Sequence, residues 1–214
     1  MELKDAIITR RSYTKYLDKK VDLKLIADIL NTAIYAPSSG NMQNWYIVLV
    51  DDDDKREKIA NASLKQLWML QAPIHIVICD KKPDMKRMYG KKAEEFGLQN
   101  CSALAQNILL LATEAGLASC WVGSFDKEAV SRIIRASQNE EPKIIITLGY
   151  SNDNPKSTRH ELDKVCFFNS CGARIKGFDL FPLEKYTIKM EKKMEKESKS
   201  LFERIKKLFK RSED

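Results

Sequence analysis

Four short apolar runs constrain the fold of this chain more than any other feature. They cover residues 45–50, 74–79, 119–122 and 143–148. Runs of this length, rich in Ile and Val, predict strands buried on both faces of a sheet. Segments with helical spacing separate them, as Leu104, Ile108 and Leu111 show. Strands interleaved with helices predict a sheet flanked by helices.

Capping residues mark where several of the helices begin and end. Asp22 and Asp126 each precede a helical pattern, and a carboxylate at this position accepts a backbone hydrogen bond. Gly116 follows the longest pattern and suits a helix C-terminus. The predicted helices cover residues 3–9, a segment capped by Asp22 that ends before Pro37, a segment beginning at 51–54, residues 93–115 and residues 127–135.

The composition excludes several classes of protein. The five cysteines are scattered and odd in number, which argues for free thiols rather than a disulfide framework or a zinc site. The longest apolar run is far too short to cross a bilayer. The N-terminus lacks a secretion signal, so a cytoplasmic location is expected.

The net charge of +7 says little about the core, because much of the excess lies in residues 189–211. Basic residues elsewhere are not interleaved with a stacking platform of aromatic side chains, so nucleic-acid binding is not predicted. The sequence has no metal motif, no dinucleotide or Walker loop and no catalytic triad. Of the two histidines, His75 is expected to be packed in a strand and His160 to be exposed.

Two polar segments could bind a ligand. Arg10, Arg11 and Ser12 follow the first helix, and arginine guanidinium groups match phosphate oxygens. Alone, such a doublet is more often simply solvated. In the second segment, residues 36–45, Asn41 and Gln43 carry amides suited to a flavin's pyrimidine edge, although the segment also resembles an ordinary turn.

Two further segments are weaker signals when taken alone. Residues 115–125 are apolar and end near Gly123, where a backbone N–H could face a flavin nitrogen; a buried turn explains them equally well. Residues 156–162 form a second basic cluster that includes Arg159.

Together, in this order, these segments resemble the nitroreductase family of FMN enzymes. The resemblance covers about residues 2–170. The matching pieces are R-R-S at 10–12, A-P-S-S-G-N-x-Q-x-W at 36–45, A-P-I-H-I-V-I-C-D at 72–80, Q-N-I-L-L-L-A-T-E-A-G-L-A-S-C-W-V-G at 106–123 and L-G-Y at 148–150 with an Arg-containing loop after it.

The resemblance implies an α+β nitroreductase-like fold, with a central mixed or antiparallel sheet flanked by helices in an intertwined homodimer. It implies FMN at the interface, with NADH or NADPH as co-substrate. It implies that one subunit contacts the FMN phosphate and ring through Arg10, Arg11, Ser12, Thr14 and Arg159. It implies that the loop reaching the flavin, largely from the other subunit, contributes Pro37, Ser38, Ser39, Asn41 and Gln43. The stretch implied to lie along the ring is Cys120, Trp121, Val122 and Gly123.

This sequence departs from the family pattern at two points. Thr14 stands where many members carry a basic residue, and Lys15 is the possible substitute. Asn44 replaces the usual proline before Trp45, a change expected to loosen a turn without removing a ligand. The family's variable active-site helix, between Asp80 and Phe96, is short and polar here.

The chain is expected to divide into an FMN-binding domain, residues 1–182, and a basic amphipathic C-terminal helix, residues 183–214. That helix packs on the dimer or makes a weak membrane-surface or protein contact. No protein side chain is assigned as a catalytic acid or base.

The expected activity is ping-pong transfer of electrons from NAD(P)H through FMN to a nitroaromatic, quinone or similar small acceptor. The alternatives are a flavin-loaded binding or redox-sensing module, or another reaction on the same scaffold, such as dehalogenation or oxidative dehydrogenation.

Overall fold

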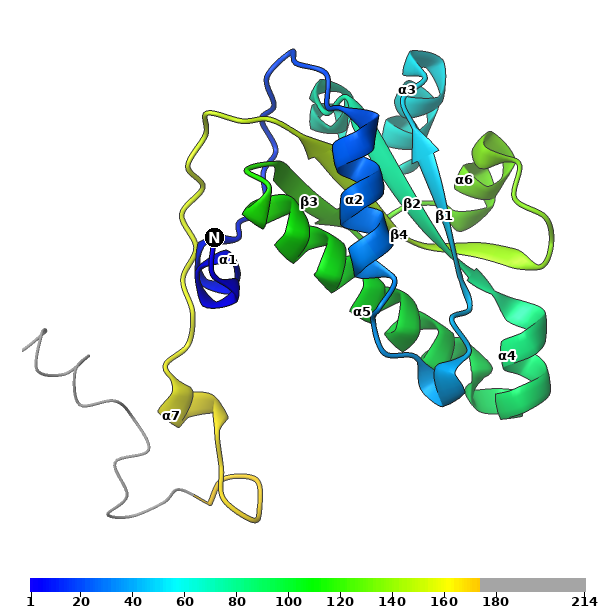
Figure 1. The fold of residues 1–214 in the computed structure, drawn as a ribbon. Coiled ribbons are helices and arrows are strands. Elements are labelled where there is room, and N and C mark those ends of the chain that lie inside the picture. Colours follow the sequence, from blue (N-terminus) through cyan, green and yellow to red (C-terminus); the bar gives the residue numbers. More distant parts are fainter. Residues whose placement is uncertain (174–214) are drawn as a thin grey trace, which may run out of the picture. The chain divides into compact units, whose positions relative to one another are not determined.

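The computed structural model in Figure 1 describes residues 1–173. Residues Met1–Ser157 form one compact unit, and a second unit begins at Thr158. The described part of the second unit contains one short helix, α7 (Leu162–Val165). The predicted amphipathic helix over residues 183–214 lies outside the described residues.

The first unit is built on a four-stranded sheet in which every neighbouring pair is antiparallel. Its strands are β1 (Trp45–Val50), β2 (Ile74–Lys81), β3 (Ala118–Val122) and β4 (Glu140–Gly149). Their order across the sheet is β1-β2-β4-β3, so the two longest strands lie at the centre. All four predicted strands are confirmed, and so is the α+β class.

Helices cover both faces of this sheet. They are α1 (Leu3–Thr9), α2 (Leu23–Ala33), α3 (Asp53–Ala62), α4 (Lys82–Tyr89), α5 (Ala93–Glu114) and α6 (Lys127–Ile134), with 3-10 turns η1 (Ser39–Asn41), η2 (Leu67–Gln71) and η3 (Gly90–Lys92). The predicted caps are confirmed: Asp22 accepts from the Lys24 N–H and Asp126 from the Ala129 N–H. Gly116, with φ +74°, follows the end of α5.

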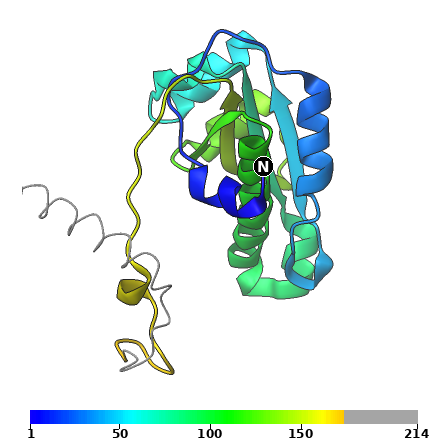
Figure 2. The ribbon, with the colours of Figure 1, turned by 60° about the vertical axis from the view of Figure 1, so that its left-hand side comes forward.

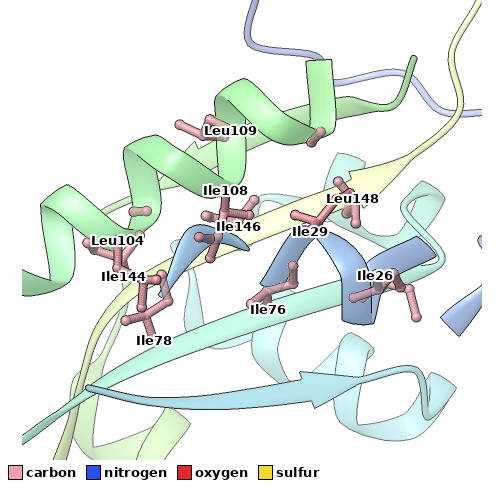
Figure 3. Close-up of a cluster of buried hydrophobic side chains, with 14 of the residues drawn as sticks. Ile26, Ile29, Ile76, Ile78, Leu104, Ile108, Leu109, Ile144, Ile146 and Leu148 are labelled. Atoms are coloured by element: carbon pink, nitrogen blue, oxygen red, sulfur yellow. The ribbon is translucent and has the colours of Figure 1, made fainter. Parts of the chain in front are cut away.

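The core divides into two layers because residues of a strand alternate between the faces of the sheet. Ile76, Ile78 and Ile146 pack with side chains of α2 and α5, as Figure 3 shows. Val77 and Ile145 point the other way, toward α3 and α6. The central strands β2 and β4 are therefore buried on both faces, as predicted for all four runs.

The same prediction is wrong for β1. Only Val50 of this strand is buried, while Tyr46 and Leu49 are exposed. The reason is its place at the edge of the sheet, where no helix covers its full length. The opposite edge is different, because residues 11–17 run beside β3; the Tyr13 N–H donates to the Ser119 carbonyl at 3.1 Å.

His75 of β2 is fully buried, as the sequence predicted for a packed strand histidine. Its Nε2 lies 2.9 Å from the Met69 carbonyl oxygen, so the neutral ring donates from Nε2. Nδ1 has no hydrogen-bond partner among the described residues. Burial, and secondarily the charge of Arg56, lower the pKa of His75 to about 4 despite the bond to Met69.

This buried imidazole should make stability depend on pH. The folded-state pKa lies below the unfolded value of about 6.5, so the unfolded chain binds the proton first as the pH falls. The free energy of unfolding should decrease between about pH 6.5 and pH 4, by about 2–3 kcal/mol from this group. Urea unfolding of wild type and His75→Gln at pH 7 and pH 4.5 measures the difference.

His160→Gln serves as the matched control, because it removes an exposed histidine and should keep the wild-type dependence on pH. Equal dependence in wild type and His75→Gln would contradict the assignment.

Candidate functional site

Two of the segments singled out in the sequence meet at β3. The Tyr13 N–H donates to the Ser119 carbonyl oxygen at 3.1 Å, which brings the segment after α1 to β3. Ser12 and Arg10 lie close enough to act on the Cys120 thiol. Burial raises the pKa of Cys120, whereas Ser12 and Arg10 oppose that rise. The exposed Ser12 hydroxyl and the half-buried Arg10 guanidinium thus stand at the surface directly over this strand.

Arg11, the second residue of the basic doublet, has a structural use. Its Nη1 donates to the carbonyl oxygens of Ile8 at 2.7 Å and Arg10 at 2.8 Å. A cation bonded to the last carbonyls of a helix stabilises that end, so Arg11 closes α1. Thr14 and Lys15 are both exposed further along the segment.

The end of β3 presents a mixed surface. The Val122 side chain is buried in the core with Val77 and Ile145, so only its backbone can face a ligand. Trp121 remains about one-third exposed and lies over Gly123, where an added Cβ would stand 3.5 Å from the indole nitrogen. The accessible groups here are the Trp121 ring and the backbone at Gly123.

The loop of residues 37–43, called here the 37–43 loop, has an unusual backbone. Gly40, Asn41 and Gln43 have φ of 57°, 54° and 45°. A Cβ on Gly40 would lie 2.6 Å from the Tyr89 hydroxyl oxygen, so a larger residue would displace the end of that side chain and would be strained at this φ. The Gln43 N–H donates to Ser38 Oγ at 3.0 Å, which closes the loop.

The structure does not bring the 37–43 loop to Arg10 and Ser12 within one chain. Cys120 is paired with Thr147 of β4, whereas Asp80, which anchors the loop, is paired with Glu141. Six residues of strand separate these two β4 positions, or about 20 Å. Figures 1 and 2 show the loop beside α4, at the end of α5 opposite to α1.

A buried polar network beneath the 37–43 loop escaped the sequence reading. Asn100 Oδ1 accepts from the Ser39 N–H at 2.9 Å and from Ser39 Oγ at 3.1 Å. Asn100 Nδ2 donates to Asn44 Oδ1 at 2.6 Å, and Asn44 Nδ2 donates to Asp80 Oδ1 at 2.5 Å. Asn44, Asp80 and Asn100 are each 3% exposed or less.

The expected effect of Asn44 was therefore wrong. This residue was predicted to loosen the turn where relatives carry proline, yet its side chain joins the loop to β2 and α5. A detectable signal was the position of Asn100. It falls among the buried residues Gly97, Cys101 and Leu104 of α5, where a polar side chain requires a partner.

Charged groups surround the same end of the sheet. Burial raises the pKa of Asp80, opposed by the hydrogen bond from Asn44 and by the charge of Lys143. Three lysines neutralise Glu141: Lys82 at 2.6 Å, Lys127 at 2.7 Å and the buried Lys143 at 2.9 Å. Those hydrogen bonds outweigh burial and lower the pKa of Glu141 to about 2.

Arg159 belongs to the second unit, where its Nη1 donates to the Thr158 carbonyl at 2.8 Å. His160 is exposed, as predicted. Among residues 1–173, no group of three or more His, Cys, Asp or Glu side chains is placed to hold a metal ion. Within that same range, no helix has the length and apolarity to span a bilayer.

Comparison with known proteins places this geometry in a family. The sequence pattern of the nitroreductase family matches residues 7–150. A provisionally named NADH dehydrogenase/NAD(P)H nitroreductase of Methanothermobacter thermautotrophicus is 32% identical over 159 residues, which cover 72% of this chain and 80% of that protein. The chain therefore belongs to the nitroreductase family of oxidoreductases, as the sequence predicted.

Solved structures agree. A provisionally named NADH dehydrogenase/NAD(P)H nitroreductase from Bacteroides thetaiotaomicron superposes with a TM-score of 0.68 at 29% identity, covering 78% of this chain and 96% of that one. A provisionally named NAD(P)H:FMN oxidoreductase from Staphylococcus epidermidis has a TM-score of 0.70 at 21% identity, with coverage of 78% and 95%. The nitroreductase fold is thus confirmed.

The environment of the cysteines predicts their reactivity. Burial raises the pKa of Cys79 and of Cys101 to about 12, and it raises that of Cys120 as well. Cys166 and Cys171 are exposed. Because the thiolate is the reactive form, an aromatic disulfide reagent at pH 8 should titrate two thiols quickly in the native protein and three only after denaturation. A third fast thiol, lost in Cys120→Ala, would show that the β3 site is open.

Proposed function

We propose that this protein is an FMN-dependent NAD(P)H oxidoreductase that passes electrons to a nitroaromatic, quinone or similar small acceptor. The observation that carries the proposal is that the segment with Arg10 and Ser12 is hydrogen-bonded to β3, through the Tyr13 N–H and the Ser119 carbonyl, in a chain of the nitroreductase family. The names of the relatives, NAD(P)H nitroreductase and NAD(P)H:FMN oxidoreductase, point the same way.

The residues present suit a phosphorylated flavin. Arg10 offers a guanidinium for a phosphate, and Ser12 adds a hydroxyl. Gly123 is exposed just after the end of β3.

The chain's own part in the reaction is binding and orientation. Bound FMN would supply the redox chemistry, accepting a hydride and releasing electrons to the second substrate. Arg10 and Ser12 would hold the phosphate end, and the Trp121–Gly123 backbone would face the ring. No side chain is assigned to move a proton, and the buried thiol of Cys120 is poorly suited to do so because its pKa is raised.

We further propose a homodimer in which each flavin is completed by the 37–43 loop of the partner subunit. In one chain this loop and α1, which Arg10 follows, lie at opposite ends of α5, and this separation supports sharing of the site. Apolar side chains that a monomer would leave in water support association: Leu3, Ile7 and Ile8 of α1 are more than half exposed, and Tyr35 is 86% exposed. A cytoplasmic location is part of the same proposal.

Removing Arg10 should weaken cofactor binding. Heat-released cofactor should be FMN by chromatography, because Arg10 and Ser12 suit one terminal phosphate and the sequence contains no dinucleotide-binding motif. Arg10→Ala should lower FMN affinity by about 1.5–3 kcal/mol, the scale of a hydrogen bond to a charged group. Fluorescence titration of apoprotein measures this, with Arg132→Ala on α6, an exposed arginine, as the control. Release of FAD, or unchanged affinity in Arg10→Ala, would overturn the assignment.

One flavin face serving both substrates in turn should give ping-pong kinetics. Initial rates with NAD(P)H and a quinone, plotted as double reciprocals, should yield parallel lines. Intersecting lines would indicate a ternary complex and would exclude a shared binding face.

A subunit-mixing experiment tests the shared site. One chain carries Arg10→Ala and the other carries Asn41→Asp with Gln43→Glu, which removes the loop's amide donors at nearly constant size. Each homodimer should bind FMN weakly. The mixed dimer, isolated through two different tags, should contain one intact site and one doubly altered site, and should therefore bind half of its FMN with wild-type affinity. Weak binding at both sites would show that each loop serves its own chain.

A further inference from the structure

We propose that Asn100, Asn44 and Asp80 are positioning residues that hold the 37–43 loop in the conformation needed to contact the partner subunit's flavin. This inference rests on the proposed function, because it assigns a role at the same site. None of the three side chains is exposed enough to touch a ligand, so they act through Ser39.

Asn100 is the centre of the network, and its amide is fully used. Oδ1 accepts two hydrogen bonds, both from Ser39, and Nδ2 donates to Asn44 and faces the Met85 sulfur at 4.0 Å. A side-chain amide offers two donors and one doubly accepting oxygen, so no capacity is left. Asn100 therefore ties α5 to the 37–43 loop, to the entry of β1 and to α4 at once.

Asn44 and Asp80 fix this arrangement from the sheet. The Lys81 N–H donates to the Asn44 carbonyl oxygen at 2.6 Å, so Asn44 is bound to β2 by both backbone and side chain. On α5, a Cβ at Gly97 would overlap the Asp80 carboxylate, which shows how closely helix and carboxylate approach. A proline at position 44 would close the turn but would leave Asn100 Nδ2 and Asp80 without this partner.

The loop needs such support because its backbone is unfavourable. Three residues, Gly40, Asn41 and Gln43, lie at positive φ, and for Gln43 in particular this region is sparsely populated. Conformations of this kind persist only where surrounding contacts impose them. The bonds from Ser39 to Asn100 lie immediately before this strained stretch and hold its start in place.

The network also sets the polarity of Ser39. Because Ser39 Oγ donates its only hydrogen to Asn100, it presents lone pairs alone to any other group. The hydroxyl is therefore an acceptor, suited to an N–H of a ligand's pyrimidine-type edge and unsuited to a carbonyl.

The test compares two asparagines of α5. Asn100→Leu removes the network. Asn107→Leu, on the same helix, removes a single bond, to the carbonyl oxygen of Ala33 in α2. Asn100→Leu should raise the FMN dissociation constant about tenfold or more and shift the visible absorption bands of bound FMN. Asn107→Leu should change neither. Asn44→Ala, which keeps the Ser39 bonds, provides a milder second variant and should give a smaller change in the same direction.

Subunit mixing separates positioning from damage to the fold. In a mixed dimer of Asn100→Leu with Arg10→Ala, one site combines Arg10 of the Asn100→Leu chain with the unaltered loop of the other chain. That site should bind FMN with wild-type affinity, because the Asn100→Leu defect lies in the loop that faces the other site. Weak binding there would mean that Asn100 supports its own subunit generally, and would overturn the proposal.

The same set distinguishes failure of the proposed function. If Arg10→Ala leaves FMN affinity unchanged, the flavin site itself is wrongly assigned. If Arg10→Ala weakens binding while Asn100→Leu and Asn107→Leu match wild type, only the positioning role is refuted.

Discussion

The pairing of β2 with β4 is the interaction on which the rest of this structure depends. Both strands are buried on both faces, so their alternating side chains belong to two separate hydrophobic layers. On one face of the sheet, Ile76, Ile78 and Ile146 pack against α2 and α5. On the other face, Val77 and Ile145 pack against α3 and α6. At about 25 cal/mol for each Å² of apolar surface buried, this double use of two strands dominates the stability of the unit.

The same pair also determines where functional groups lie. Arg10 and Ser12 reach the sheet near Thr147, and Asn44 and Asp80 mark its other end near Glu141. α5 runs between these ends and contributes Asn100 to the loop side. A chain built in this way holds these two groups of residues apart, which is why we propose that a second subunit completes the flavin site. In the proposed role, the buried polar residues Asn44, Asp80 and Asn100 fix one conformation of the 37–43 loop rather than add to the net stability of the fold.

Much of the candidate site could be predicted from the sequence because the residues of each motif are near one another along the chain. The basic doublet, the 37–43 loop and residues 120–123 were each recognisable as short motifs. The structural role of each residue within a motif could not be predicted in the same way. Arg11 closes α1, Val122 fills the core, and Asn44 is a buried connector rather than a loosened turn. The partners of Val122 and Asn44 lie tens of residues away along the chain, which spacing within a motif does not reveal.

Sequence alone determined the strands, the helix caps and the family, because apolar periodicity and capping chemistry are local and the motifs recur in a recognisable order. Tertiary structure decided the rest. It placed β1 at an edge, so that this apolar strand is only partly buried, and it joined Ser39, Asn44, Asp80 and Asn100 across 61 residues of chain. The physical reason is that a buried polar group must find its partner in space, and only the packing of α5 against β1 and β2 defines which partner is there.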